Sequence, residues 1–382
     1  MTVTYDLLVK NGYVVDPSQG IDGLRDIAIA QGVVQAVAPQ ILDPAAAILD
    51  ATGLIVTPGL VDLHAHVYRD ASESGADANE HCLRQGVTTV VDGGSAGAMN
   101  FLGLRRFIVE ASQTRVLSFL SACKLGVELG RLQHLDFNAA VTVATTHRDV
   151  IRGIKIRLGA RRTGAFSAHY LRLAKEVART AHVPLMVHIF GPDPLPDALP
   201  LPDVLQVLEG GDIITHSFHP PPSPHAPSSL FDRSGRLLNA VLDARQRGVL
   251  FDVGHGRYQF SWGTAETAIR HGFLPDTISS DLTKYSVDTI VYDLPTVLSK
   301  FLTLGLSLTE VIQRSTVNPA AALGLSEHIG SLKPGAAGDV AIFRLDEAPC
   351  AFWDTLSTIR EERTVPKRLT PVHVIKAGRI IR

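Results

Sequence analysis

The sequence contains few cysteines and has a small net charge. Its 382 residues include three cysteines, at positions 82, 123 and 350. An odd and sparse set argues against a disulfide framework and fits a reducing compartment. The formal net charge is −2, so no strong electrostatic field would attract nucleic acid or an anionic membrane.

Long apolar runs are also missing, because Asp, Pro or Gly interrupts each candidate before it could span a bilayer. The N-terminal segment lacks the basic region and apolar core of a signal peptide. These absences predict a cytoplasmic protein whose partner is a small molecule, with no role for nucleic acid or a membrane. Apolar residues still make up 45% of the chain, which is ample for a large domain and a small one.

The two ends of the chain are rich in short segments typical of β-strands. Segments 5–17, 25–39 and 46–59 near the N-terminus contain many β-branched residues and are punctuated by Gly, Asn, Asp and Pro. Segments 338–345 and 372–381 near the C-terminus have the same character. We therefore predict one small β-sandwich domain made from residues 1–57 and 331–382.

The middle of the chain, residues 58–330, alternates strand-like and helix-like segments. The eight predicted strands are continuous apolar runs, as expected for parallel strands covered on both faces, and span residues 59–66, 87–94, 116–126, 151–159, 183–190, 212–219, 249–256 and 276–283. Eight βα units in about 270 residues are typical of a (β/α)₈ TIM barrel. A doubly wound open sheet is the alternative, but eight regular units favour closure into a barrel.

Polar side chains fall on these apolar strands, mostly where the strands end. The set is His64, His66, Lys155, His188, His216 and Asp281. The carboxyl ends of barrel strands converge on one mouth, so residues distant in sequence would meet there. Each histidine alone would fit a structural role. Burying so many polar groups together without partners, however, would cost several kcal/mol per group. The coincidence therefore predicts a metal site.

Lys155 is the unusual member of the set, because it lies between two isoleucines in a strand that should be buried. A lone ammonium there would be expensive to desolvate. Either the side chain reaches the strand end, or its charge is removed. A lysine with a depressed pKa can react with CO₂ to form a carbamate, which offers two anionic oxygens to metal ions.

The set resembles the amidohydrolase superfamily, in the dihydroorotase-like amidohydrolase/deacetylase group with a carboxylated lysine. The resemblance extends to the segments at 57–66, 307–325 and 330–343. It implies two divalent metals. One would be held by His64, His66 and Asp281 and the other by His188 and His216, with carboxylated Lys155 and a hydroxide bridging them. Zn²⁺ fits this imidazole-rich set best. The resemblance is also compatible with a homo-oligomer.

The same resemblance implies a hydrolase that cleaves a small acyl ester or acyl amide, such as an O-acetyl 2-hydroxy acid or an N-acetyl amino acid. The bridging hydroxide would attack the acyl carbon, and Asp281 would act as the catalytic base. A cyclic-amide hydrolase or a deaminase on the same scaffold is the alternative. A metal-free scaffold protein is a further one, but all six ligand positions are present.

The substrate of such an enzyme would carry a carboxylate, which requires a cation near the mouth. Arg69, Lys124, Arg157 and Lys284 follow predicted strands and are the candidates. We predict substrate-binding roles for Tyr68, Arg69, His255 and Lys284. Dihydroorotases carry a carboxylate-binding arginine two residues after the histidine pair. Tyr68 stands at that position here.

Overall fold

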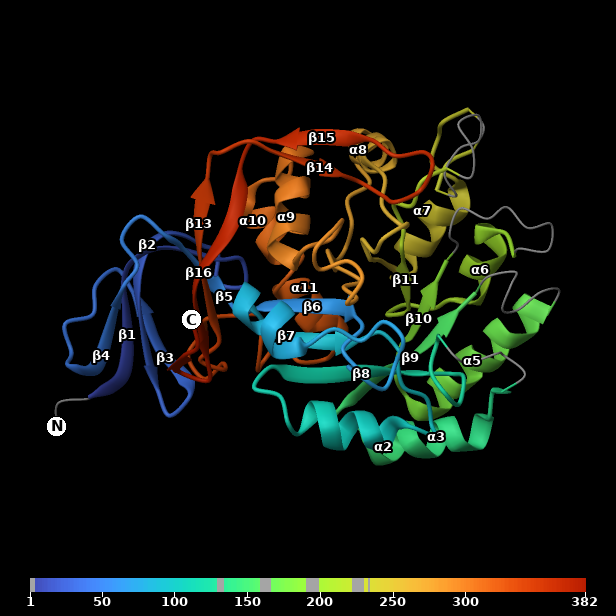
Figure 1. Ribbon diagram of the computed structural model, residues 1–382, viewed down its shortest axis with the longest axis horizontal. Coiled ribbons are helices and arrows are strands. Elements are labelled where there is room, and N and C mark those ends of the chain that lie inside the picture. The colour runs from blue at the N-terminus through green and yellow to red at the C-terminus, as the bar shows by residue number, and fades with distance from the viewer. Residues whose placement is uncertain (1–3, 129–133, 159–165, 190–198, 222–229, 233) are drawn as a thin grey trace.

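A computed structural model describes residues 4–128, 134–158, 166–189, 199–221, 230–232 and 234–382. Its centre is a curled parallel sheet whose strands follow one another in chain order (Figure 1). These strands are β6 (Leu60–Ala65), β7 (Val87–Asp92), β8 (Arg115–Ser121), β9 (Ile151–Arg157), β10 (Leu185–His188), β11 (Ile213–Thr215) and β12 (Leu250–Phe251). The predicted α/β fold with a parallel central sheet is therefore confirmed.

The eighth predicted strand, residues 276–283, is not a regular strand. It still joins the two edges of the sheet, because parallel bridges link Thr277 to Asp252 and Leu282 to Ala65. The amide of Asp281 also donates to the carbonyl of His64 over 2.6 Å. Asp281 has a φ of 48°, and this left-handed backbone interrupts the extended conformation of the segment. The interruption lies at the residue expected to bind metal.

Helices cover the outside of the curled sheet (Figure 1). The longest is α5 (Ser167–Ala181), whose buried face contains Leu171, Ala174, Val177, Ala178 and Ala181 at helical spacing. Further helices follow the strands in turn. They are α1 (Ala78–His81), η1 (Leu83–Gln85), α2 (Phe101–Leu104), η2 (Arg105–Val109), α3 (Phe137–Thr146), α6 (Leu201–Val207), α7 (Asn239–Gln246), α8 (Trp262–Arg270), α9 (Leu294–Thr303), α10 (Leu308–Gln313) and α11 (Val317–Ala322). None of the helices in these described ranges is long and apolar enough to cross a membrane.

Both ends of the chain contribute to a second, mixed sheet, which we call the terminal sheet. Its order is β17-β16-β13-β5-β1-β2-β3, and β4 pairs with β1. The strands are β1 (Tyr5–Asp16), β2 (Ile21–Ala30), β3 (Val33–Ala38), β4 (Ala45–Asp50), β5 (Ile55–Pro58), β13 (Val340–Asp346), β16 (Arg368–Lys376) and β17 (Arg379–Ile380). An apolar core lies on this sheet and is built from residues 7–56 and 332–375, including Val56 and Ile342.

A two-stranded hairpin lies between β13 and β16 in the sequence and leaves the terminal sheet. Its strands are β14 (Cys350–Trp353) and β15 (Glu362–Val365), and they run across the top of Figure 1 above α9 and beside α8. Asp354, which follows β14, accepts a hydrogen bond from the amide of Trp262 at the start of α8. The C-terminal part of the chain therefore contacts the barrel at a second place.

Candidate metal centre

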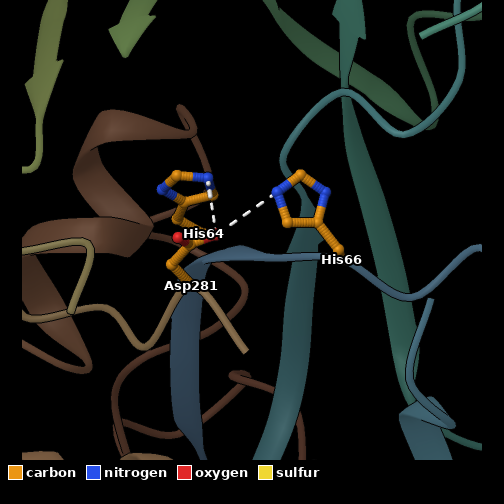
Figure 2. Close-up of side chains that lie close together, drawn as sticks. All are labelled: His64, His66 and Asp281. Atoms are coloured by element: carbon orange, nitrogen blue, oxygen red, sulfur yellow. Dashed lines mark ion pairs between the residues drawn. The ribbon is translucent and has the colours of Figure 1, made fainter. Parts of the chain in front are cut away.

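Two histidines and one aspartate meet at the end of β6 (Figure 2). His64 and His66 come from β6 and the residue after it, and Asp281 lies in the segment that closes the sheet. Asp281 Oδ1 is 3.4 Å from His64 Nε2 and 3.2 Å from His66 Nε2. One donor atom from each of the three buried residues lies within 4.8 Å of the other two. This spacing is suitable for a single metal ion.

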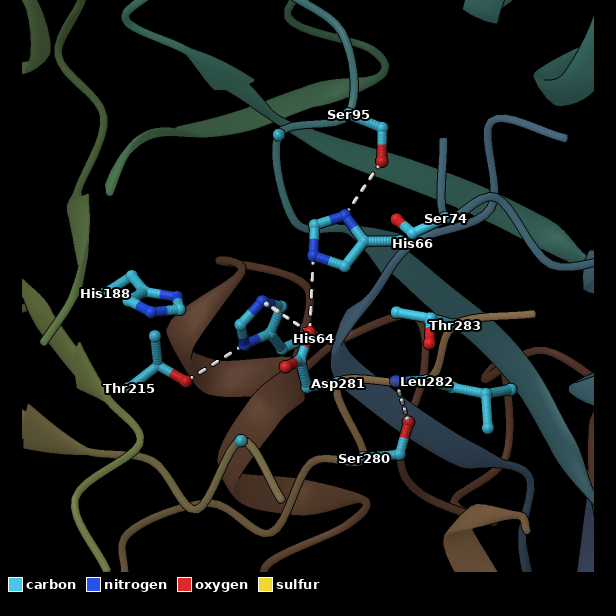
Figure 3. A network of polar contacts seen from close by, with 12 residues as sticks. His64, His66, Ser74, Ser95, His188, Thr215, Ser280, Asp281, Leu282 and Thr283 are labelled. Atoms are coloured by element: carbon cyan, nitrogen blue, oxygen red, sulfur yellow. Dashed lines mark hydrogen bonds and ion pairs between the residues drawn. The ribbon is translucent and has the colours of Figure 1, made fainter. Parts of the chain in front are cut away.

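Hydroxyl groups contact the Nδ1 atoms of these two imidazoles (Figure 3). Ser95 Oγ lies 2.8 Å from His66 Nδ1, and Thr215 Oγ1 lies 2.9 Å from His64 Nδ1. Thr215 donates its own proton to the carboxylate of Asp252 over 2.7 Å, so it accepts from the Nδ1–H of His64. The Nε2 atom of His64 then carries a lone pair toward the centre. Partners of this kind orient metal-binding imidazoles in proteins.

A second pair of imidazoles lies beside the first. His216 Nε2 is 2.8 Å from His188 Nδ1 and 4.0 Å from Asp281 Oδ2. The Nδ1 of His216 lies 2.6 Å from the carbonyl of Gly254, which only accepts, so this nitrogen carries the proton. Burial lowers the pKa of His216 to about 3, and the ring is neutral. Its Nε2 therefore also carries a lone pair.

Lys155 lies among these imidazoles rather than at the protein surface. Its side chain is 1% exposed, and Nζ lies 2.8 Å from His64 Nε2 and 3.1 Å from Met186 Sδ. Burial lowers the pKa of Lys155 to about 7. Two glycines after β7 make room for the group: a Cβ at residue 93 would lie 2.4 Å from His64 Cδ2, and one at residue 94 would lie 2.9 Å from Lys155 Cβ.

The charge of Asp281 depends on its neighbours. Burial raises the pKa of the carboxyl, but the surrounding imidazoles, His64 first, outweigh it and hold the pKa below its usual range. For His66, burial lowers the pKa, but the hydrogen bond and the charge of Asp281 raise it above its ordinary value. The structure thus brings all six sequence-predicted ligands together around an anionic carboxylate.

The group borders a cavity of about 150 Å³. His66, Lys155, His188 and Asp281 form one side of it. The rest of its described lining is Ser74, Val127, Glu128, Arg157, Arg257, Tyr258, Gln259 and Thr283. Arg157 is one of the cations named from the sequence. Residues 257–259 were not predicted from the sequence, although they come directly after the predicted strand at 249–256, and this position is the signal that could have identified them.

The four residues predicted to bind substrate do not line this cavity. The hydroxyl of Tyr68 donates to the carbonyl of Asn100 over 3.1 Å, and Arg69 forms ion pairs with Asp70 and Asp77. Their placement does not support the predicted roles. Tyr68 contacts a backbone carbonyl and Arg69 contacts two carboxylates instead, and strand position alone does not reveal such contacts.

His255 and Lys284 are also absent from the described lining of the cavity. His255 is fully buried, with Nδ1 2.9 Å from the carbonyl of Gly256 and Nε2 2.8 Å from Lys300 Nζ. Lys284 is exposed, and its Nζ lies 5.1 Å from the centre of the Tyr285 ring. His255 thus anchors a buried lysine in this structure, and its predicted contact with substrate has no support from its position.

Comparison with known proteins shows to which family the chain belongs. Residues 263–381 match the Amidohydrolase family. A deacetylase from Brucella anthropi is 34% identical over 343 residues, which cover 87% of this chain and 83% of that protein. The chain belongs to the amidohydrolase family. A deacetylase from Agrobacterium fabrum is 33% identical over 314 residues, covering 80% of this amidohydrolase and 74% of its relative.

Solved structures of similar fold support this family assignment. A crystal structure of an adenine deaminase has a TM-score of 0.88 at 28% identity, covering 98% of this amidohydrolase and 99% of that chain. A crystal structure of a dihydroorotase has a TM-score of 0.86 at 29% identity, covering 98% of both chains. The predicted class, a metal-dependent hydrolase of the amidohydrolase superfamily, is therefore confirmed.

Proposed function

We propose that this amidohydrolase holds two divalent metal ions and removes the acyl group from a small, carboxylate-bearing ester or amide. O-acetyl 2-hydroxy acids and N-acetyl amino acids are the substrates we expect. One observation carries the proposal: four imidazoles, the Asp281 carboxylate and the Lys155 amine converge beside a cavity of about 150 Å³. The deacetylase names of two relatives support the acyl group as the part removed.

The donor set fits divalent metal. His64, His66 and Asp281 would hold the first ion, since their donor atoms lie within 4.8 Å of one another. His188 and His216 would hold the second, because both rings are buried beside the first three ligands and His216 Nε2 carries a lone pair. Imidazole-rich sites with few carboxylates suit Zn²⁺.

A carboxylated Lys155 would complete the pair. The unmodified amine lies 2.8 Å from a proposed ligand nitrogen, where a buried ammonium would repel a cation. Addition of CO₂ forms an N–C bond and releases one proton, and the carbamate that results is anionic. Its two oxygens would extend from the Lys155 position to both ions. The charge of the lysine would then favour metal binding rather than oppose it.

Asp281 is the residue we expect to move the proton. When bound, the two ions supply a Lewis acid for the acyl carbonyl and lower the pKa of water at the site. The Asp281 carboxylate is kept anionic by its imidazole neighbours, so it can accept a proton from that water. It can then return the proton to the leaving alcohol or amine.

We further infer that the terminal sheet is a separate β-sandwich domain, with boundaries at 1–57 and 331–382, beside a barrel domain at 58–330. The apolar core shared by the two ends of the chain supports this division. Both domains would contribute to one folded unit, since Arg115 of β8 pairs with Asp339 beside the terminal sheet over 2.8 Å.

The test combines metal analysis with a substrate panel. We expect about two metal ions per chain, and acetate release from O-acetyl-lactate or N-acetylalanine of one configuration. Ring opening of dihydroorotate or hydantoin, or ammonia release from adenine, without acetate release would instead favour the second candidate function. Less than one metal per chain after Zn²⁺ and bicarbonate are added would contradict the metal proposal.

A further inference from the structure

The loop after β12 brings a cation to the proposed site. Gly256 has a φ of 53°, and a Cβ there would lie 2.5 Å from Asp281 Oδ2. Glycine therefore lets the loop pass directly over the carboxylate. The loop continues with Arg257 and Gln259, which both line the cavity. Its course thus places Arg257 in the same cavity lining as the proposed ligands Lys155 and His188.

The backbone of Arg257 is held by the β14–β15 hairpin. The amide of Leu356 donates to the Arg257 carbonyl over 2.8 Å, and the Thr355 hydroxyl donates to it over 3.3 Å. The guanidinium carbon lies 5.0 Å from the centre of the Tyr285 ring and 5.5 Å from that of Tyr258. An arginine packed on ring faces keeps its N–H edge available for a planar anion.

The charges around the cavity leave Arg257 available to a ligand. Within the described parts of the chain, no carboxylate forms an ion pair with it. The carboxylate of Glu128, in the same lining, accepts from the amide and hydroxyl of Ser74. Arg157 adds a second positive charge to the lining. Of the cations named from the sequence, Arg69 is already paired and Lys284 lies outside the described lining.

The geometry points to Arg257 as the residue that binds the substrate carboxylate and so sets specificity for acyl acids over their neutral analogues. This inference rests on the proposed function. Arginine forms two parallel hydrogen bonds with a carboxylate, and such charged bonds are stronger than neutral ones. The chemistry assigned to the ligand is an anion near the acyl group, small enough for the cavity.

The experiment compares Arg257→Met with the wild type on paired probes: N-acetylalanine against N-acetylalaninamide, and O-acetyl-lactate against O-acetyl-lactamide. We expect Arg257→Met to lower kcat/KM for the carboxylates about 100-fold and to change it less than about threefold for the neutral amides. Arg257→Lys should recover part of the loss, since it keeps the charge without the fork. The matched control is Arg360→Met, an exposed arginine packed 4.5 Å from the Trp353 ring.

Two outcomes overturn the inference: equal losses on both members of a probe pair, or wild-type kcat/KM on the carboxylates in Arg257→Met. Calorimetric titration of the purified proteins with N-acetylalanine separates this inference from the proposed function. If the wild type binds the probe without turnover, the proposed function fails. Arg257 is still supported if Arg257→Met binds at least about tenfold more weakly than Arg360→Met, and rejected if the two bind alike.

Discussion

Buried carboxylates in the terminal sheet and at the metal centre have different kinds of partner. In the terminal sheet, Asp26 accepts from the amides of Asn11 and Ile41 over 3.0 and 2.9 Å, and Asp16 accepts from the amide of Leu332 over 2.7 Å. At the mouth, Asp281 faces imidazole nitrogens at 3.2–3.4 Å. Backbone amides hold the buried carboxylates of the terminal sheet in place, whereas the imidazoles beside Asp281 are side chains that could bind a metal ion together with it. The buried carboxylates therefore stabilise the fold in the terminal sheet, and in the proposed function Asp281 serves metal binding.

The largest effect should follow from Asp281→Asn at the metal centre. The amide keeps the shape of the side chain but cannot accept the proton, so kcat should fall by up to about 10⁴-fold. The melting temperature should stay close to that of the wild type, and part of the metal should remain bound. Steady-state kinetics on the acetylated probe and metal analysis check this. A kcat near the wild-type value would remove Asp281 from the proposed chemistry.

Ile342→Ala tests how much the apolar core of the terminal sheet contributes to the stability of the protein. Ile342 is fully buried in the apolar core of the terminal sheet, and its loss should lower the free energy of unfolding by about 2–5 kcal/mol. Ile48→Ala is the matched control, because Ile48 in β4 is 64% exposed and its loss should cost less than about 0.5 kcal/mol. Urea unfolding gives both values. A fall in the kcat of the folded Ile342→Ala protein would show that the two regions are coupled.

Lys300 should give a pH dependence of stability rather than a loss of activity. It donates to His255 Nε2 and to the carbonyls of Ile290 and Trp353 over 2.8–3.2 Å, so it joins the β14–β15 hairpin to the barrel. Burial lowers the pKa of Lys300 to about 7, while Asp354 opposes the shift. Burial keeps the pKa of His255 well below its ordinary value, so this ring stays neutral in the same pH range.

Between about pH 7 and pH 10 the unfolded chain then binds more protons at Lys300 than the folded chain does. The free energy of unfolding should therefore rise with pH, by at most about 1.4 kcal/mol per pH unit. Lys300→Met lacks this contribution, so the stability of the wild type relative to the variant should increase across the window. Urea unfolding at several pH values measures it. Parallel curves for the two proteins would contradict the lowered pKa.

The proximity of the proposed metal ligands could be predicted from the sequence because strand ends converge in a curled parallel sheet. His64, Lys155 and His216 are far apart in the chain, yet their place on apolar strands was enough to bring them together. The same rule does not locate the side chains of Tyr68 and His255. A residue just beyond a strand has a backbone set by its loop, and its side chain follows local partners such as the Asn100 carbonyl and Lys300.

The loop after β12 could not be derived from strand pattern for a related reason. Arg257 is placed by hydrogen bonds from Thr355 and Leu356, about a hundred residues later in the chain. No periodicity in the sequence links the two segments. Likewise, Asp281 has a φ of 48° inside a segment that was expected to be one extended run and that joins the sheet through isolated bridges at Thr277 and Leu282. Both departures lie beside the proposed metal ligands.

A crystal structure of the metal-loaded protein, with anomalous scattering recorded at the metal absorption edge, would show whether the six proposed ligands hold two metal ions. We expect two anomalous peaks. One would lie among His64, His66 and Asp281 and the other beside His188 and His216, with extra density on Lys155 Nζ joining them. A single peak away from these residues, or no peak in protein soaked with Zn²⁺ and bicarbonate, would contradict it.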